Sequence, residues 1–131
     1  MPILNVKVSA KKSREMTQKI TTILSGLTAN ILKKKPEVTS IVVDYVDPDH
    51  WIVGGKSLTE LSKHSFYFDI KITDETNTKA EKDEYIREVF GAFGKLLGNL
   101  HEVSYIYVED VRATAYGYGG KTQEYRYHLP Y

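Results

Sequence analysis

The residue best suited to proton transfer in this sequence lies at its N-terminus, in Met1-Pro2-Ile3-Leu4. Removal of Met1 would leave Pro2 with a free secondary amine, and an α-amino group titrates near neutral pH, at about 7.7–8.0. A general base works best when its pKa lies close to the operating pH. Burial beside aromatic side chains and a nearby cation would lower the pKa of this amine further. Pro2 is therefore the candidate catalytic base, provided that Met1 is removed.

The composition excludes several other kinds of reactive centre. The 131 residues include no cysteine, so a thiolate nucleophile, a disulfide and a cysteine-based zinc site are excluded. The four histidines show no metal-ligand spacing, and we expect neither a metal nor a cofactor. A formal net charge of +1 gives no reason to expect a nucleic-acid partner. Because no membrane span or signal-like segment is recognisable, we expect a cytoplasmic protein without membrane contact.

The elements that would position Pro2 follow as strand, helix and strand. Residues 2–9 alternate apolar and polar side chains with the period of a strand. Ser13 then precedes apolar residues that repeat at spacings of three and four over residues 16–31, which predicts a helix with Ser13 as its N-cap. The β-branched run at residues 41–46 predicts a strand covered on both faces. A small hairpin with a Gly-Gly pair is expected over residues 50–56, and a linker over residues 57–64.

The second half of the chain repeats this pattern. Residues 66–73 match residues 2–9 position by position, 64 residues later, with the same phase of alternation. A second helix and a second buried strand follow at nearly the same offset. Two such units predict an α+β fold, with one four-stranded sheet and both helices on one face. The expected organisation is a first unit at 1–57, a second unit at 66–122, and a C-terminal segment at 123–131 that packs on a neighbouring subunit or on its own.

Several of these motifs together resemble the 4-oxalocrotonate tautomerase family. They are Pro2 at the start of a strand, the helix after Lys11-Lys12-Ser13, the strand ending at Val46, and the hairpin His50-Trp51-Ile52-Val53-Gly54-Gly55. The second unit is similar to the same template without its proline. The resemblance implies an isomerase with a catalytic N-terminal proline and a small enol or unsaturated keto acid as substrate. For a double-length chain it also implies a homotrimer, in which six units form a pseudo-hexamer.

The sequence departs from the family at the residues that bind the substrate acid. The family's first-loop arginine falls on Lys12, and its second-strand arginine falls on Ser40. Lysine supplies charge but not the planar bidentate contact of a guanidinium group. Arg112 is the unassigned cation that we expect near the pocket. Because Phe66 replaces the proline in the second unit, we expect at most one working site per chain.

Three aromatic residues complete the candidate substrate-binding set. Trp51 is either a wall of the pocket or a core residue of its hairpin. Tyr105 and Tyr116 either donate hydrogen bonds to a bound oxyanion or stabilise the sheet and an interface. The full substrate-binding set is Lys12, Ser40, Trp51, Tyr105, Arg112 and Tyr116.

Two functions remain open: a tautomerase that depends on Pro2, and a non-catalytic trimeric binding or scaffold protein of the same fold.

Overall fold

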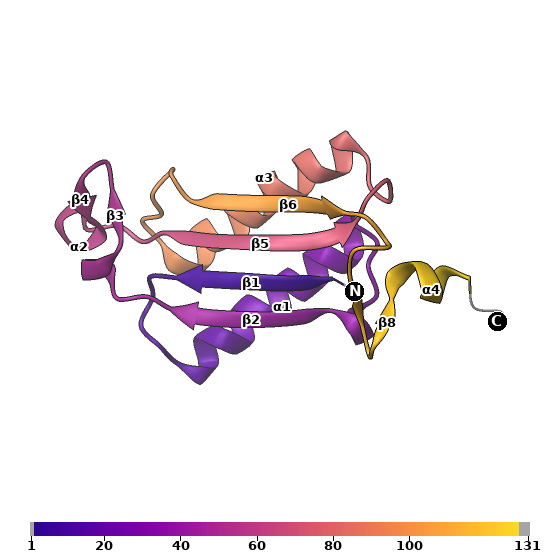
Figure 1. The fold of residues 1–131 in the computed structure, drawn as a ribbon. Helices are drawn as coiled ribbons and strands as arrows, with labels where there is room; N and C mark the ends of the chain where they lie inside the picture. Colours follow the sequence, from indigo (N-terminus) through magenta and orange to yellow (C-terminus); the bar gives the residue numbers. More distant parts are fainter. Residues whose placement is uncertain (1, 129–131) are drawn as a thin grey trace.

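In the computed structural model, which describes residues 2–128, a four-stranded mixed sheet is covered on one face by two long helices (Figure 1). The strand order is β2-β1-β5-β6. β1 is parallel to β2 and β5 is parallel to β6, whereas the central strands β1 and β5 are antiparallel. This architecture confirms the predicted α+β fold of two β-α-β units. The strands are β1 (Ile3–Val8), β2 (Ser40–Tyr45), β5 (Phe66–Thr73) and β6 (Tyr105–Val111), and the helices are α1 (Arg14–Ile31) and α3 (Lys79–Leu97).

Each unit ends in a short hairpin followed by a short helix. In the first unit these are β3 (Ile52–Val53), β4 (Lys56–Ser57) and α2 (Leu58–Leu61). In the second unit they are β7 (Gly117–Tyr118), β8 (Lys121–Thr122) and α4 (Gln123–Tyr127). Two 3-10 turns, η1 (Pro36–Val38) and η2 (Pro48–His50), flank β2. The two hairpins lie at opposite ends of the sheet (Figure 1).

The segment expected to be a linker after the first hairpin contains α2 instead. The helix forms because Ser57 caps it: its hydroxyl accepts from the Glu60 amide, and the Glu60 carboxylate accepts from the Ser57 amide. Residues 123–127, expected as part of a C-terminal packing segment, form α4, with Thr122 as the N-cap. Residues 129–131 of that segment lie outside the described residues.

The core lies between the sheet and the two long helices. Ser13 caps α1 as predicted, because its side chain accepts from the Met16 amide at 2.9 Å. The Tyr85 hydroxyl shares a buried hydrogen bond of 2.8 Å with Thr28, which joins α3 to α1. The alternating strand residues that face the helices are completely or almost completely buried: Leu4, Val6, Val8, Phe66, Phe68, Ile70 and Ile72.

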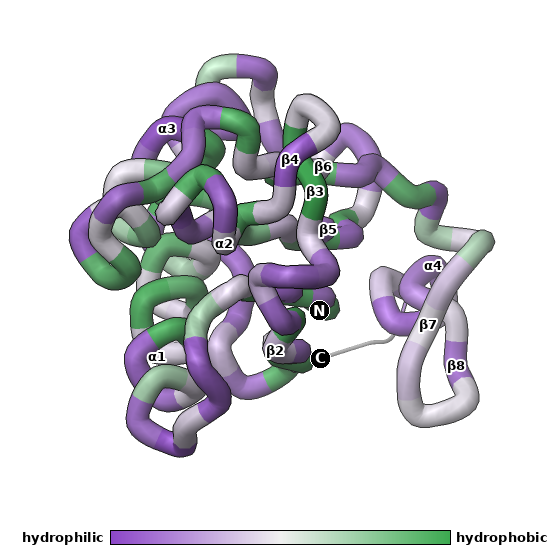
Figure 2. The backbone as a smooth tube through the Cα atoms, turned by 90° about the vertical axis from the view of Figure 1, so that its left-hand side faces the viewer, coloured by the Kyte–Doolittle hydropathy of each residue, from purple (hydrophilic) through white to green (hydrophobic). Residues whose placement is uncertain are grey.

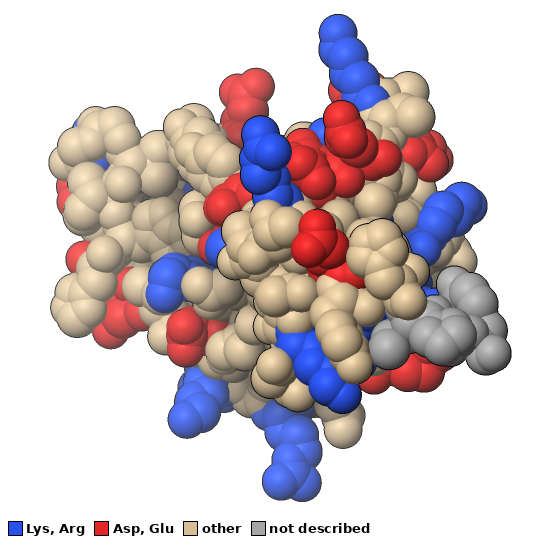
Figure 3. Space-filling view, turned by 45° about the vertical axis from the view of Figure 1, so that its right-hand side comes forward, with Lys and Arg blue, Asp and Glu red and all other residues tan. Residues whose placement is uncertain are grey.

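The opposite face of the sheet is open in the single chain. We predicted that β2 would be covered on both faces, but Val42 is 48% exposed because nothing in the described chain packs over it. Tyr105 and Tyr107 on β6 are about equally exposed. Figure 2 shows that the β7–β8 hairpin and α4 stand on this side of the sheet, opposite α1 and α3. Uncharged surface with interspersed carboxylates and cations covers the face seen in Figure 3.

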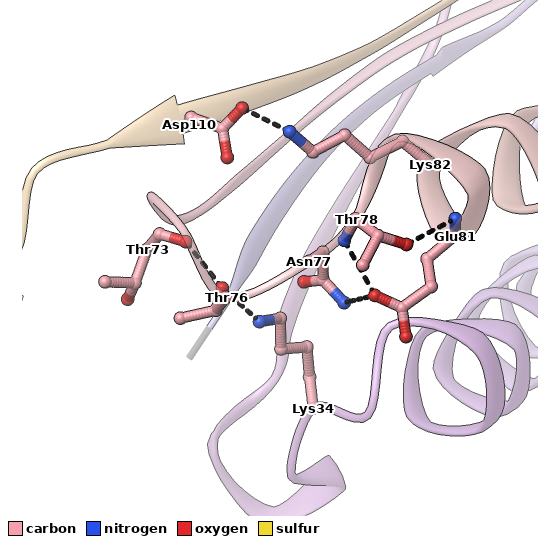
Figure 4. Close-up of polar contacts among 8 residues, drawn as sticks. All are labelled: Lys34, Thr73, Thr76, Asn77, Thr78, Glu81, Lys82 and Asp110. Carbon is pink, nitrogen blue, oxygen red and sulfur yellow. Dashed lines mark hydrogen bonds and ion pairs between the residues drawn. The ribbon is translucent and has the colours of Figure 1, made fainter.

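A polar cluster ties the end of α1 to the loop between β5 and α3 (Figure 4). Lys34 Nζ donates to Thr76 Oγ1 at 2.9 Å, and Thr76 Oγ1 donates to the Thr73 carbonyl at 2.5 Å. Burial lowers the pKa of the Lys34 ammonium. Lys82 forms an ion pair of 2.6 Å with Asp110. The cluster thereby holds the C-terminal end of β5, where Thr73 reaches the candidate site.

None of the helices within residues 2–128 has the length and apolar character needed to cross a bilayer. The same part of the chain contains no group of three or more His, Asp or Glu side chains placed to hold a metal ion.

Candidate active site

Pro2 is buried at the start of β1 and lines a cavity of about 560 Å³ at one end of the sheet. Its carbonyl accepts a hydrogen bond of 3.0 Å from the Ser40 amide, which fixes the start of β1 against β2. The second unit contributes the other walls, including Lys71, Tyr116 and Tyr118. The cavity therefore combines the strand starts of the first unit with the hairpin of the second.

Among the described residues that line this cavity, Lys71 is the cation, and sequence reasoning missed it. The antiparallel pairing of β1 with β5 sets Lys71 opposite Ile3, beside Pro2. Lys71 Nζ lies 2.7 Å from Asp69 Oδ1, and this hydrogen bond raises the pKa of the lysine, so it stays charged. The sequence did carry a signal, because Lys71 matches Lys7 in the repeat. Its position beside Pro2 could be recognised only by knowing that β5 runs antiparallel to β1.

Tyr116 brings a phenol group into the same cavity. Its hydroxyl is hydrogen-bonded to Thr73 Oγ1, at the end of β5. Burial raises the pKa of Tyr116, so the phenol remains protonated at neutral pH. The next residue, Gly117, must be glycine because a Cβ there would lie 1.9 Å from the Lys121 carbonyl oxygen. The local backbone thus fixes the tyrosine at the cavity.

The structure places Trp51 and Tyr105 elsewhere, in a cavity of about 660 Å³ that also contains Phe66. This cavity is the counterpart of the Pro2 cavity. In the repeat, Trp51 corresponds to Tyr116, Tyr105 to Ser40, Phe66 to Pro2, and Lys7 to Lys71. Since the central strands are antiparallel, the two cavities form at opposite ends of the sheet. Within one chain, Ser40 and Tyr116 are the members of the predicted substrate-binding set that line the Pro2 cavity.

Comparison with known proteins identifies the family. A family model described as a tautomerase enzyme matches residues 2–61. The probable tautomerase K2 of Dickeya dadantii (strain 3937) is 31% identical over 65 residues, which are 46% of this chain and 91% of that protein. The chain belongs to the tautomerase family. The tautomerase model covers the first unit through α2, the unit that carries Pro2.

Solved structures extend the likeness in fold beyond the first unit, to nearly the whole length of this tautomerase-family chain. A crystal structure of native fused 4-OT is 18% identical, with a TM-score of 0.82, and the match covers 94% of this chain and 97% of that one. The F6 fused 4-OT asymmetric trimer is 16% identical, with a TM-score of 0.81 over 95% of this chain and 98% of that one. A macrophage migration inhibitory factor-like protein of Entamoeba histolytica, 16% identical, has a TM-score of 0.75, with 92% and 97% covered. The resemblance to fused 4-oxalocrotonate tautomerases is thereby confirmed.

The two cations of the predicted substrate-binding set, Lys12 and Arg112, lie outside the Pro2 cavity of this tautomerase-family chain. Lys12 lines a separate cavity with Lys11 and His64, beyond the far end of β1. The six residues of β1 span roughly 20 Å, so Lys12 does not reach Pro2 in its own chain. Arg112 follows the end of β6 at the Pro2 end of the sheet, but its side chain is exposed and is not part of the cavity wall.

Proposed function

We propose that this protein is a tautomerase in which Pro2, freed by removal of Met1, acts as general base on a small enol or unsaturated keto acid. The observation that carries the proposal is the burial of Pro2 in a cavity that Lys71 and Tyr116 also line. The Pro2 amine takes the enol hydroxyl proton and then delivers a proton to carbon, which yields the keto form.

The neighbouring side chains have distinct roles in this proposal. Lys71 attracts the substrate carboxylate. It thereby compensates for the two family arginines that are replaced here by Lys12 and Ser40. Tyr116 donates a hydrogen bond to the oxygen on which negative charge develops. When Thr73 donates to the Tyr116 oxygen, the phenol keeps its own proton for the substrate. Apolar wall residues such as Val38 limit access of water.

The proposal includes a cytoplasmic homotrimer with the open sheet faces directed inward. Such an assembly would cover the exposed apolar and aromatic side chains Ile3, Val42 and Tyr107. The F6 relative is described as a trimer of fused 4-OT, which supports this arrangement. In a trimer, Lys12 would serve the cavity of a neighbouring copy, and Arg112 would be a further cation at the Pro2 end.

The test combines intact mass with enol ketonisation, followed by ultraviolet absorbance. We expect the purified protein to lack Met1, and we expect Pro2→Ala to lower kcat by at least about a hundredfold, because a positioned general base contributes that much. Pro48→Ala, in the turn η2 beside the other hairpin, is the matched proline control and should retain activity. Retention of Met1, or full turnover by the Pro2→Ala variant, would rule out the proposed role of Pro2.

One observation favours a second candidate, a non-catalytic trimeric binding protein of the same fold. Ser40 lines the Pro2 cavity at the position where the family has a substrate-binding arginine. On this alternative, the protein would bind an enol-acid analogue without turning over any enol acid. Binding of the analogue measured by calorimetry, together with the ketonisation assay, distinguishes the two functions: binding without turnover indicates the binding protein, and turnover indicates the tautomerase.

A further inference from the structure

Arg126 on α4 holds the hairpin that forms one wall of the Pro2 cavity. Its Nη2 atom donates to the Tyr118 carbonyl oxygen at 2.8 Å. Its guanidinium carbon also lies 3.8 Å from the centroid of the Tyr118 ring, a close cation–π contact. Since Tyr118 lines the cavity with Pro2, one side chain fastens both the backbone and the ring of a wall residue.

Among its described residues, the first unit has no equivalent of this contact. In the repeat, Leu61 stands where the second unit has Arg126, and Val53 stands where it has Tyr118. In the first unit, α2 is instead fastened to η2 through a hydrogen bond of 2.5 Å from Thr59 to Asp49. The first hairpin borders the Phe66 cavity. Of the two cavities described, the one that contains the proline is therefore the one with the arginine contact.

The hairpin of the second unit needs such support. Its strands β7 and β8 have two residues each, and an isolated two-stranded hairpin is marginally stable in water. Gly119 and Gly120 at its tip both have positive φ angles. The hairpin also stands off the open side of the sheet (Figure 2), and the Tyr118 side chain remains 39% exposed. The contact with Arg126 therefore restricts the position of the Tyr118 ring.

We propose that Arg126 is a positioning residue for substrate binding in the Pro2 cavity. It acts through Tyr118 and the β7–β8 hairpin, and it touches no reacting atom. A wall that is already ordered spares the substrate the entropic cost of ordering it on binding. Loss of the guanidinium group therefore weakens binding, while the proton transfer at Pro2 keeps its rate once substrate is bound. This inference rests on the proposed tautomerase function.

The first test measures the steady-state kinetics of enol ketonisation for Arg126→Met and Arg126→Lys. We expect Arg126→Met to raise KM about tenfold with little change in kcat, because a charge-assisted hydrogen bond and a cation–π contact are lost together. Arg126→Lys should give an intermediate KM, since an ammonium group retains charge over the ring but lacks the planar fork. Arg87→Met removes an exposed arginine that is paired with Asp83 on α3, and it should leave KM unchanged.

The second test, hydrogen exchange, needs no activity. The Gln123 amide donates to the Tyr116 carbonyl at 2.9 Å, and the Leu58 amide makes the equivalent bond to Trp51 in the other hairpin, also at 2.9 Å. We expect Arg126→Met to speed exchange at Gln123 and to leave Leu58 unchanged. Unchanged exchange at Gln123 would refute the positioning role. Faster exchange with an unchanged KM would refute its effect on binding. Failure of the tautomerase function is recognised separately, by a Pro2→Ala variant with full turnover.

Discussion

Pro2 and Phe66 occupy equivalent positions in the two units, yet the antiparallel pairing of β1 with β5 places them at opposite ends of the sheet. Phe66 pairs with Val8 at the end of β1, whereas Pro2 precedes Ile3 at its beginning. The Phe66 ring is completely buried and stacks on Phe93 at a centroid distance of 4.1 Å. One end of the sheet therefore has a candidate base at this position, and the other end has a core aromatic.

Replacing the lysine of each cavity in turn tests which of the two cavities binds the substrate carboxylate. We expect Lys71→Met to raise KM for a carboxylate substrate about tenfold or more, because a hydrogen bond to a charged group contributes about 1.5–3 kcal/mol. Lys7→Met is the matched control: Lys7 has the equivalent place in the other unit and pairs with Asp44 at 3.5 Å. Unfolding should be measured alongside, because Asp69 would lose its cation. Equal effects of both variants on KM would contradict a specific role for Lys71.

The hydroxyl of Tyr116 should matter for turnover, and the ring of Trp51 should not. We expect Tyr116→Phe to lower kcat on the order of tenfold to a hundredfold, because it removes a donor to the developing oxyanion. Trp51→Phe should leave kcat and KM unchanged, since Trp51 borders the Phe66 cavity. Steady-state kinetics of the two variants on one enol acid provide the comparison. If Trp51→Phe lowered kcat as much as Tyr116→Phe, the assignment of the Pro2 cavity as the active site would be contradicted.

Loss of the buried hydrogen bond between α1 and α3 should lower the stability of the protein without directly affecting catalysis. Tyr85→Phe leaves the buried Thr28 hydroxyl without its partner, so the free energy of unfolding should fall by about 1–3 kcal/mol in denaturant titrations. Adding Thr28→Val removes the unpaired hydroxyl and should restore part of this loss. Because burial raises the pKa of Tyr85, the phenol stays protonated, and the effect should be the same at pH 6 and pH 8. A double variant less stable than Tyr85→Phe would argue against this explanation.

The cap of α3 predicts a stability difference that depends on pH. The backbone hydrogen bond from Thr78 lowers the pKa of Glu81 below its ordinary value of 4.5. The ionised Glu81 therefore contributes stability that is fully present above pH 4.5 and is lost as the pH falls through the lowered pKa. We expect Glu81→Gln to lower the thermal midpoint at pH 7, and the difference from the natural chain to shrink below pH 4.5. A difference that stays constant into strong acid would contradict the role of the charge.

Most of the fold could be predicted from the sequence, because its determinants are local. Alternation with period two marks β1 and β5, and the Ser13 cap with its apolar stripe marks α1. The repeat then predicted the sheet with both long helices on one face. The short helices α2 and α4 escaped prediction, since four or five residues carry too little periodicity and a cap signal without an apolar stripe resembles a turn.

The sequence by itself determined the two units, the long helices and the strand that begins at Pro2, because periodicity and capping act between residues close along the chain. Only the tertiary structure decided which groups meet Pro2. The antiparallel pairing of the central strands brings Lys71, Tyr116 and Tyr118 from the second unit to the first unit's proline, and it takes Trp51 to the other end. Contacts between residues this far apart depend on strand order and direction, which local patterns do not encode.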